Sequence, residues 1–447
     1  RFVVYSSLST DLVTGQNEPA ATENVFLYDS LGNGGAGSTV MVSHQAGTTA
    51  TSADGTSFNP VVSGDGSTIA FFSTSTNLIS GQTIPNGTVQ LYVYDVASGG
   101  IKLATHAFGA PISGASTGAN GANPGVPPGP SVHWQNTLGY SVPAYPGTSG
   151  LGGGFFPGGV AGGLALPSLS HDGKYIVYID DATNLGAANT GLDPFSGLPN
   201  TNVYLYNNNP ADGTFGSNTL ISHAAGQSTT TANGSAGGGG AYASTAAISA
   251  DGSTVAFTDP GVNLVTGQST DGVSDQLYVW HRTGAQAGTT VLASHKLGAS
   301  LVGGTIGGSF LFGFTGDTPP SLSGDGSVVA YYFAGTDLVN TTAATQGTPS
   351  VLNVFRYDVA SNTNDLVTHV FGDNTKMGDN PQNQIASFGV GPSEATGPHI
   401  SSDGHYIAYA NNSSNLLSTP ISGQNGRDNV YLYDSTRQEA ERGKRIV

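Results

Sequence analysis

The chain has 447 residues, of which 67 are glycine and none is cysteine, and 29 acidic residues against 12 lysines and arginines give a net charge of −17. The lack of cysteine excludes disulfide scaffolds and thiolate metal centres, and the shortage of basic residues argues against nucleic-acid binding. No run of about 20 apolar residues is present, so the sequence predicts no membrane-spanning helix. Because glycine, threonine, serine and asparagine disfavour helical bundles, we expect a β-rich fold.

The sequence begins with a short β-type run at residues 1–7, and similar runs recur at residues 67–72, 174–179, 253–258, 327–332 and 405–410. Each later run follows a Ser-x-Asp-Gly tetrapeptide, at residues 63–66, 170–173, 249–252, 323–326 and 401–404. Asp-Gly between apolar runs is a tight-hairpin signal, so each tetrapeptide is predicted to join two antiparallel strands. The chain therefore contains six copies of a repeat, the first entering after its opening turn.

Each copy continues with three further features in the same order. An Asx-Leu pair opens a loop, at residues 11–12, 77–78, 184–185, 263–264, 337–338 and 415–416. An aromatic strand beginning with an amide residue follows, at residues 24–29, 90–95, 202–207, 276–281, 353–358 and 429–434. A fourth run ends in Ser/Thr-His, at His44, His106, His223, His295 and His369. Each copy is thus predicted to form four short strands, A to D in chain order.

This combined pattern resembles the TolB-like propeller repeat. The resemblance implies an all-β fold, namely a six-bladed β-propeller of four-stranded blades that forms a single domain over residues 1–447. The blades are expected at residues 1–44, 60–106, 167–223, 246–295, 320–369 and 398–447, with an insert at residues 107–166. The first blade is expected to lack its inner strand in this chain, that strand being absent or supplied from outside residues 1–447. Such propellers serve as binding platforms, enzyme gates and spacers, so the fold does not decide the function.

Residues that occur in every copy are most simply explained as parts of the blade. The Asp-Gly turns lack the intervening residue and the Trp of a sialidase Asp box, so we interpret them as structural turns. The repeated histidines would lie around the rim, too far apart to share a metal ion, and each is expected to tie strand D to the next linker. The Asx side chains are expected to cap turns in their own loops.

One loop between strands B and C carries carboxylates at Asp271 and Asp275, and Asp428 lies in the equivalent loop of the last copy. Calcium prefers about six to eight oxygen ligands, of which such loops can supply three or four. The other copies lack the paired carboxylates. The alternatives are a calcium ion at one or two of these loops and plain turn chemistry.

Long Gly-rich inserts separate strand D of one copy from strand A of the next, on the face that also carries the B–C loops. The insert at residues 107–166 contains His133, Trp134, Tyr140, Tyr145, Phe155 and Phe156, and a second insert contains Phe310, Phe312 and Phe314. Loops longer than about 15 residues are usually functional or disordered, and disordered segments are poor in aromatic residues. The aromatic side chains therefore either bind a sugar, peptide or partner protein, or pack the loop over the propeller mouth.

No catalytic motif stands out, since every Ser-His pair belongs to the repeat. The leading hypothesis is a non-catalytic binding or assembly module that contacts a partner protein or a second copy of itself through the inserts. The alternative is a carbohydrate-active enzyme, a polysaccharide lyase or a glycosidase, with its site at the propeller mouth. The cysteine-free, acidic composition predicts an exported bacterial protein at the cell surface or outside the cell.

Overall fold

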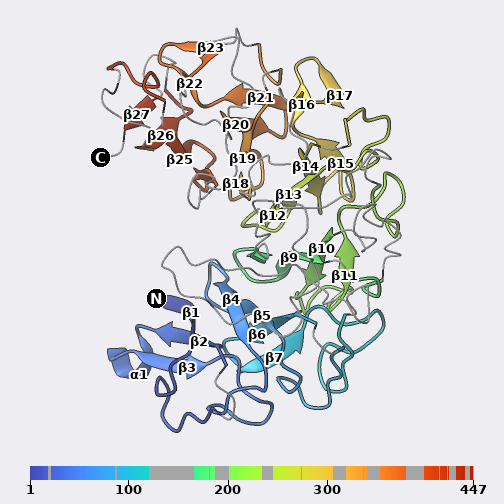
Figure 1. The fold of residues 1–447 in the computed structure, drawn as a ribbon, viewed down its shortest axis with the longest axis vertical. Coiled ribbons are helices and arrows are strands. Elements are labelled where there is room, and N and C mark those ends of the chain that lie inside the picture. The colour runs from blue at the N-terminus through green and yellow to red at the C-terminus, as the bar shows by residue number, and fades with distance from the viewer. Residues whose placement is uncertain are drawn as a thin grey trace, which may run out of the picture. The chain divides into compact units, whose positions relative to one another are not determined.

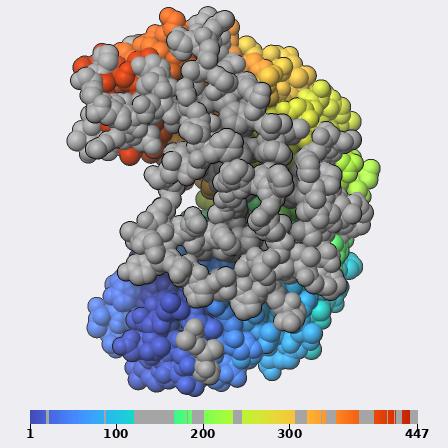
Figure 2. Space-filling model, viewed as in Figure 1, coloured from blue at the N-terminus to red at the C-terminus, as the bar shows by residue number. Residues whose placement is uncertain are grey.

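The structure is a computed structural model that describes residues 1–18, 22–85, 88–119, 166–180, 182–186, 201–233, 245–272, 274–305, 319–335, 337–340, 353–378, 397–411, 413–419, 421, 429–437 and 443–445. Figures 1 and 2 colour these residues by their position in the chain. The chain divides into two compact units. The first comprises Arg1–Leu192, Gly197–Ile221 and Ser228–Thr231, and the second comprises Asp193–Ser196, Ser222–Gln227 and Ala232–Val447.

Three antiparallel sheets follow one another in the first unit. The first sheet has three strands, β1 (Phe2–Ser7), β2 (Asn24–Asp29) and β3 (Ser38–Met41). The second has four, β4 (Ser57–Val62), β5 (Thr68–Ser73), β6 (Gln90–Asp95) and β7 (Gly100–Leu103). The third consists of β8 (Ser168–Leu169), β9 (Tyr175–Asp180), β10 (Asn202–Asn207) and β11 (Asn218–Leu220). The segment α1 (Gly32–Gly35) is an irregular turn between β2 and β3, because Asn33 has a φ of 50°.

The described part of the second unit contains three four-stranded sheets and two small hairpins. The sheets are β12 (Thr245–Ile248), β13 (Thr254–Asp259), β14 (Gln276–His281) and β15 (Thr290–Leu292); β18 (Ser321–Leu322), β19 (Val328–Phe333), β20 (Asn353–Asp358) and β21 (Thr363–Leu366); and β24 (His399–Ile400), β25 (Tyr406–Asn411), β26 (Asn429–Asp434) and β27 (Gly443–Arg445). The hairpins are β16 (His295–Lys296) with β17 (Ala299–Gly303), and β22 (His369–Val370) with β23 (Asp373–Met377). The all-β prediction is confirmed, as multiple small antiparallel sheets.

An aromatic pair joins strands B and C in every sheet. The pairs are Tyr5–Phe26, Phe71–Tyr92, Tyr178–Tyr204, Phe257–Tyr278, Tyr331–Phe355 and Tyr409–Tyr431, with ring centroids 5.6–5.8 Å apart. Aromatic pairs on neighbouring strands stabilise a sheet beyond the area that they bury. The repeated aromatic positions of the sequence therefore build the interior of each sheet.

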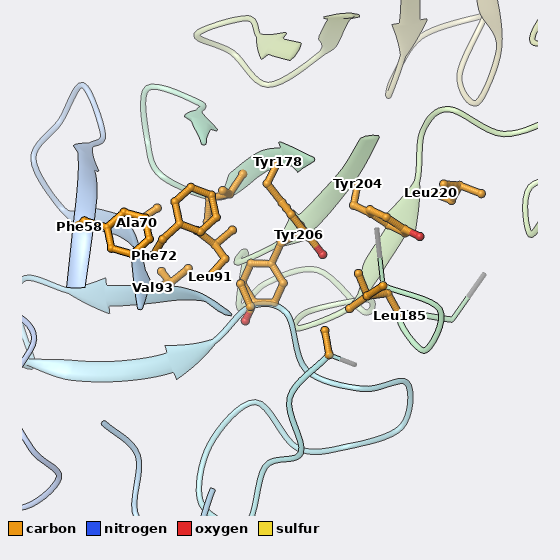
Figure 3. Packing of buried hydrophobic residues seen from close by; sticks show 14 residues of the cluster. Phe58, Ala70, Phe72, Leu91, Val93, Tyr178, Leu185, Tyr204, Tyr206 and Leu220 are labelled. Atoms are coloured by element: carbon orange, nitrogen blue, oxygen red, sulfur yellow. The ribbon is translucent and has the colours of Figure 1, made fainter. Parts of the chain in front are cut away.

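Hydrophobic clusters lie between consecutive sheets of one unit. Figure 3 shows one such cluster, in which Phe72 and Leu91 of the second sheet pack with Tyr178, Tyr204 and Leu220 of the third. Equivalent clusters join the first sheet to the second, the β12–β15 sheet to the β18–β21 sheet, and the latter to the β24–β27 sheet. Burying each large apolar side chain stabilises the fold by about 1.5–3 kcal/mol, so consecutive sheets are held together by their faces.

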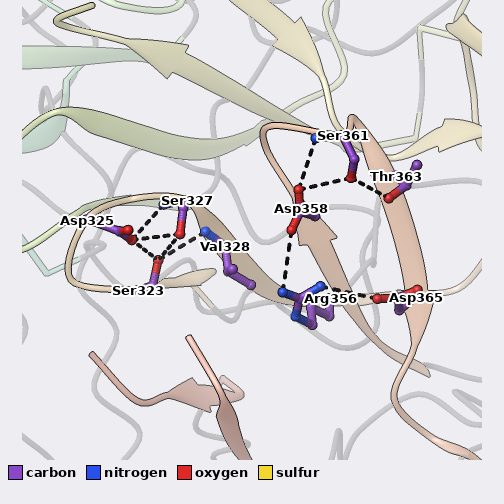
Figure 4. Close-up of polar contacts among 9 residues, drawn as sticks. All are labelled: Ser323, Asp325, Ser327, Val328, Arg356, Asp358, Ser361, Thr363 and Asp365. Carbon is purple, nitrogen blue, oxygen red and sulfur yellow. Dashed lines mark hydrogen bonds and ion pairs between the residues drawn. The ribbon is translucent and has the colours of Figure 1, made fainter. Parts of the chain in front are cut away.

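The Ser-x-Asp-Gly tetrapeptide forms the turn between strands A and B, as Figure 4 shows for one copy. Ser323 is fully buried, its Oγ donates to Asp325 Oδ1 at 2.7 Å, and the same Oγ accepts from Val328 N–H at 3.0 Å. The Asp325 carboxylate also accepts from Ser327 N–H at 3.0 Å. The other four copies make the same three bonds. The interpretation of this motif as a structural turn is thus confirmed.

Candidate functional site

A short hairpin follows strand D in five of the six repeats. It is β16–β17 and β22–β23 in two copies and single bridges, His44–Ser52 and His106–Gly118, in two others. A backbone hydrogen bond of 2.7–3.3 Å closes each hairpin. In each case an N–H group donates to a carbonyl oxygen: Ala53 to Ser43, Ala119 to Thr105, Ala232 to Ser222, Gly304 to Ser294 and Gly378 to Thr368. Residues 107–119, which the sequence interpretation assigned to an irregular insert, therefore belong to the repeat.

The tip of each hairpin binds the next sheet. The second residue after the histidine donates its N–H to the carbonyl of the next Asx residue: Ala46 to Asn77, Phe108 to Asn184, Ala225 to Asn263, Leu297 to Asp337 and Phe371 to Asn415, at 2.7–3.0 Å. The side-chain oxygens of Asn77, Asn263 and Asp337 accept from the N–H of Asp54, Asn233 and Thr305, which lie just after the hairpins. The prediction that these Asx side chains cap their own loops is therefore wrong, because they tie adjacent repeats together.

The hairpin also lies beside the B–C loop of its own repeat. Asn17 N–H donates to Ala50 O at 2.9 Å, Thr83 to Ser116 at 2.7 Å, and Ser269 to Leu301 at 2.7 Å. The D–A and B–C connections thus emerge together in these three repeats, as the sequence predicted. Within each unit taken by itself, we call the hairpins and the adjacent B–C loops the hairpin face of that unit.

The repeated histidines join neighbouring sheets. The rings of His44, His106, His295 and His369 lie edge-on to Tyr94, Tyr206, Tyr357 and Tyr433 of the following sheet, with centroids 6.2–6.5 Å apart. His106 Nε2–H also donates to Gly216 O at 2.6 Å, and His295 Nε2–H donates to Asn362 O at 3.1 Å. These contacts agree with the structural role that was predicted for the histidines.

Three large exposed apolar side chains lie in the hairpins. Phe108 is 80% exposed, Leu297 59% and Leu301 43%. Phe108 lies over Gly186 of the next repeat, where an added Cβ would come within 2.8 Å of the ring. The sequence interpretation included Leu301 in an apolar contact insert at residues 301–314, but it did not single out Phe108 or Leu297. The available signal was the recurring glycine three positions after each histidine, as in His106–Gly109 and His295–Gly298.

The most strongly perturbed carboxyl group among the described residues is that of Asp259. It is 1% exposed, and its burial raises the pKa to about 7, while a 2.6 Å hydrogen bond from Gly261 N–H to Oδ1 partly opposes this effect. The equivalent residues Ser73, Asp180 and Asn411 accept the same kind of bond from the residue two positions on. Asp259 therefore closes a turn at the end of strand B, and its raised pKa follows from burial in that turn.

Of the predicted calcium ligands, Asp271 accepts hydrogen bonds from a residue of its own loop. Asp271 Oδ1 accepts from Ser274 N–H at 2.8 Å, and Oδ2 accepts from Ser274 Oγ at 2.6 Å. Asp275 is 7% exposed, and Asp428 lies outside the described residues. Within the described residues, no three His, Asp or Glu side chains are grouped so that they could hold a metal ion. The calcium site stays a prediction.

The predicted aromatic contact residues cannot be placed. His133, Trp134, Tyr140, Tyr145, Phe155, Phe156, Phe310, Phe312 and Phe314 all lie outside the described residues. They follow the hairpins at residues 106–119 and 295–304 in the sequence. Across the part of the chain that the structure describes, no helix has the length and apolar character needed to cross a membrane.

No protein-family profile and no curated protein matches the chain. Among solved structures, it is similar to TolB from Acinetobacter baumannii, at 13% identity over 98% of this chain and 62% of that chain, with a TM-score of 0.34. It is also similar to oligogalacturonate lyase from Vibrio parahaemolyticus (12% identity, 95% of this chain, 71% of that chain, TM-score 0.38). A third similar structure is the β-propeller domain of the Trilobed protease from Pyrococcus furiosus (8% identity, 86% and 70%, TM-score 0.35). The chain thus spans less than two thirds of the TolB chain, and these values leave its activity open.

Proposed function

We propose that the chain is a six-bladed β-propeller, with a first blade that lacks its inner strand, and that it acts as a non-catalytic extracellular binding or assembly module. Its partner is another protein or a second copy of the chain, which it contacts through the hairpin face and the aromatic inserts that follow two of the hairpins. The support for the propeller is the recurrence of one small antiparallel sheet in each of the six sequence copies.

The observation that carries the proposal is that the repeated polar residues form hydrogen bonds within their own repeat or to the neighbouring repeat. In each Ser-x-Asp-Gly turn, the serine and the aspartate hydrogen-bond within the turn. The histidines and the Asx residues bind the neighbouring repeat instead. The commonest polar groups of the repeat therefore serve the architecture, which supports a scaffold with a contact function.

The hairpin face supplies the contact surface in this proposal. Phe108, Leu297 and Leu301 are large apolar side chains that project from connections, in a chain of which only 9% of the residues are charged. Exposed apolar side chains on protruding elements are typical of protein interaction sites. Trp134 and Phe312 lie in the inserts after these hairpins and extend the same apolar character in the sequence.

Light scattering after size exclusion tests the assembly. We expect the wild-type chain to elute with the mass of an assembly, and a Phe108→Ser/Leu297→Ser variant to shift towards the monomer. Leu31→Ser is the matched control, since Leu31 is 63% exposed but lies in the β2–β3 connection, away from the hairpins. A double variant with the wild-type mass would refute the contact role of the hairpin face.

Two further samples in the same experiment test the contact role of the inserts and the binding of calcium. Trp134→Ala combined with Phe312→Ala is expected to dissociate the assembly or weaken ligand binding, and wild-type behaviour would show that the inserts only pack. A chelator is added to a parallel sample. A wild-type chain that is monomeric at every concentration and indifferent to the chelator would contradict both assembly and calcium binding.

A further inference from the structure

A cavity of about 180 Å³ lies beside the hairpin β22–β23 in the second unit. Four segments of the fifth and sixth repeats line it: the B–C loop after β19, the strand β21, the hairpin itself and the strand β26 of the next sheet. At about 30 Å³ for each water molecule, the cavity has room for about six of them. It therefore suits a ligand of the size of one sugar ring and is too small for most drug-sized molecules.

His369 brings a hydrogen-bonding atom without a partner to this cavity. The residue is 6% exposed, and its Nδ1–H donates to Val370 O at 2.9 Å. Among the described residues, no hydrogen bond to Nε2 is present, whereas Nε2 of the equivalent His106 bonds to Gly216 O of the following sheet. Because Nδ1 carries the proton, Nε2 has a lone pair and is an acceptor. His369 can thus accept a hydrogen bond from a hydroxyl group of a ligand.

The remaining wall mixes polar groups with apolar surface. Asn340 contributes from the B–C loop, where it is exposed, and Thr375 contributes from the hairpin. Leu366 and the ring of Tyr433 are buried in the apolar part of the wall, and the Tyr433 ring meets that of His369 edge-on with centroids 6.2 Å apart. A sugar ring has hydroxyl groups at its edge and C–H groups on its faces, so both kinds of wall find a matching surface.

The charges at the cavity favour a neutral ligand. Asp365 lines the cavity, and Arg356 Nη1 lies 3.2 Å from its Oδ2 (Figure 4). The same guanidinium lies 3.5 Å from Asp358 Oδ2, so one positive charge serves two carboxylates. No Lys or Arg is among the described residues that line the cavity. A negatively charged ligand would therefore meet a net negative charge without a cation to bind it.

We propose that this cavity is a binding site for one neutral sugar ring, either a free hexose or the terminal residue of a glycan. His369 Nε2 accepts a hydrogen bond from one ring hydroxyl, Asn340 binds a second, and a face of the ring lies against Leu366. The ligand is a small molecule or a chain end and not a protein surface, so this site goes beyond the function proposed above. Either proposal can fail without the other.

Saturation-transfer difference NMR with the full 447-residue chain tests the site. The probes are D-glucose, D-galactose and D-mannose, each as the free sugar and as its methyl glycoside. We expect at least one of them to bind saturably. Equal binding of the two forms points to a glycan end, and binding of the free sugar alone points to a free hexose. The uronic acid of the hexose that binds, which adds a carboxylate, should bind at least threefold more weakly.

Variants of the chain provide the complementary test. His369→Phe keeps a ring beside Tyr433 but removes Nε2, and Asn340→Ala removes an amide from an exposed loop position. Each should weaken binding by about threefold to tenfold, the equivalent of one lost hydrogen bond. Thr266→Ala is the matched control, since Thr266 is exposed and lies two residues after Leu264 as Asn340 does after the repeated leucine of its own loop.

Circular dichroism melting checks that the variants fold, and Asn340→Ala keeps the test valid if His369→Phe does not. Three results would each overturn the proposal. They are the lack of saturable binding by all six probes, a uronic acid that binds as tightly as its hexose, and dissociation constants of the two site variants equal to that of Thr266→Ala. The mass measured by light scattering is independent of all three.

Discussion

Asp259 Oδ1 accepts a hydrogen bond from Gly261 N–H at 2.6 Å inside the second unit, where the carboxyl group is 1% exposed. One hydrogen bond does not replace the water that a carboxylate loses on burial, and the pKa rises from 3.8 to about 7. Asn411 performs the same task in another repeat without a charge, accepting from Ser413 N–H at 2.7 Å. The turn therefore needs the side-chain oxygen and not the negative charge.

The first prediction concerns the pH dependence that this carboxyl group imposes. Its folded-state pKa lies above the unfolded value, so the free energy of unfolding should fall as the pH rises from about 4 to about 7, by on the order of 4 kcal/mol. Asp259→Asn should remove this fall and be more stable than the wild type at pH 8. Urea unfolding at pH 5 and pH 8 measures both. Asn411→Asp should add a fall in the free energy of unfolding with rising pH. Parallel pH profiles for the wild type and Asp259→Asn would contradict the assignment of this pH dependence to Asp259.

The second prediction concerns the buried serine of the Ser-x-Asp-Gly turn. Ser323→Ala leaves the Val328 N–H without its 3.0 Å acceptor inside the sheet, which should lower the free energy of unfolding by about 1–3 kcal/mol. Ser327→Ala removes a hydroxyl that bonds to the same carboxylate at the surface, and should cost less than about 0.5 kcal/mol. Urea unfolding measures both changes. Equal losses of unfolding free energy for the two variants would show that the buried hydrogen bond from Val328 N–H to Ser323 Oγ does not dominate the stability of the turn.

The third prediction concerns the histidine that joins two sheets. His106→Ala removes the bond to Gly216 O and the edge contact with Tyr206, so we expect a loss of about 2 kcal/mol. His405→Ala is the control, because His405 is half exposed and pairs only with the exposed Asp403. Thermal unfolding of both variants measures the difference. A His106→Ala variant as stable as the control would argue against an inter-sheet role.

The fourth prediction separates backbone strain from packing at two glycines with the same backbone. Gly298 and Gly326 have φ of 75° and 69°, but a Cβ at Gly298 meets nothing within 4 Å, whereas one at Gly326 collides with Thr254 Oγ1 and Cβ of the preceding sheet. Gly298→Ala should cost about 1–2 kcal/mol for the left-handed backbone alone. Gly326→Ala should cost about 1–3 kcal/mol more because of the overlap. Similar urea midpoints for the two variants would show that consecutive sheets move apart easily.

Most of what the sequence predicted correctly depends on local signals. The Asp-Gly turns and the aromatic strands appear where the tetrapeptides and the alternating apolar residues placed them, because turn chemistry and side-chain periodicity act within a few residues. The hydrogen bonds of Ser323 and the ring pair Tyr331–Phe355 follow directly from those patterns.

The errors arose where one repeat meets the next. The role of Asn77 depends on Asp54, which lies 23 residues earlier in a segment of variable length, and no local pattern links the two. The hairpin tip at Phe108 was missed for a related reason: its bond to Asn184 is made to another sheet, across a long stretch of chain. Contacts of this kind depend on the stacking of sheets, which a single sequence does not show.

The closing bonds at Ala119, Gly304 and Gly378 have a practical consequence for engineering. Each fixes the chain to its own sheet at a defined point, so we expect residues spliced in after Ala119 or Gly378 to leave the hydrogen bonds of the described sheets unchanged. The entropy of closing a loop grows only slowly with its length. Such positions are suited to carrying foreign epitopes or whole reporter domains, because the hairpin that precedes them is already closed by a backbone hydrogen bond.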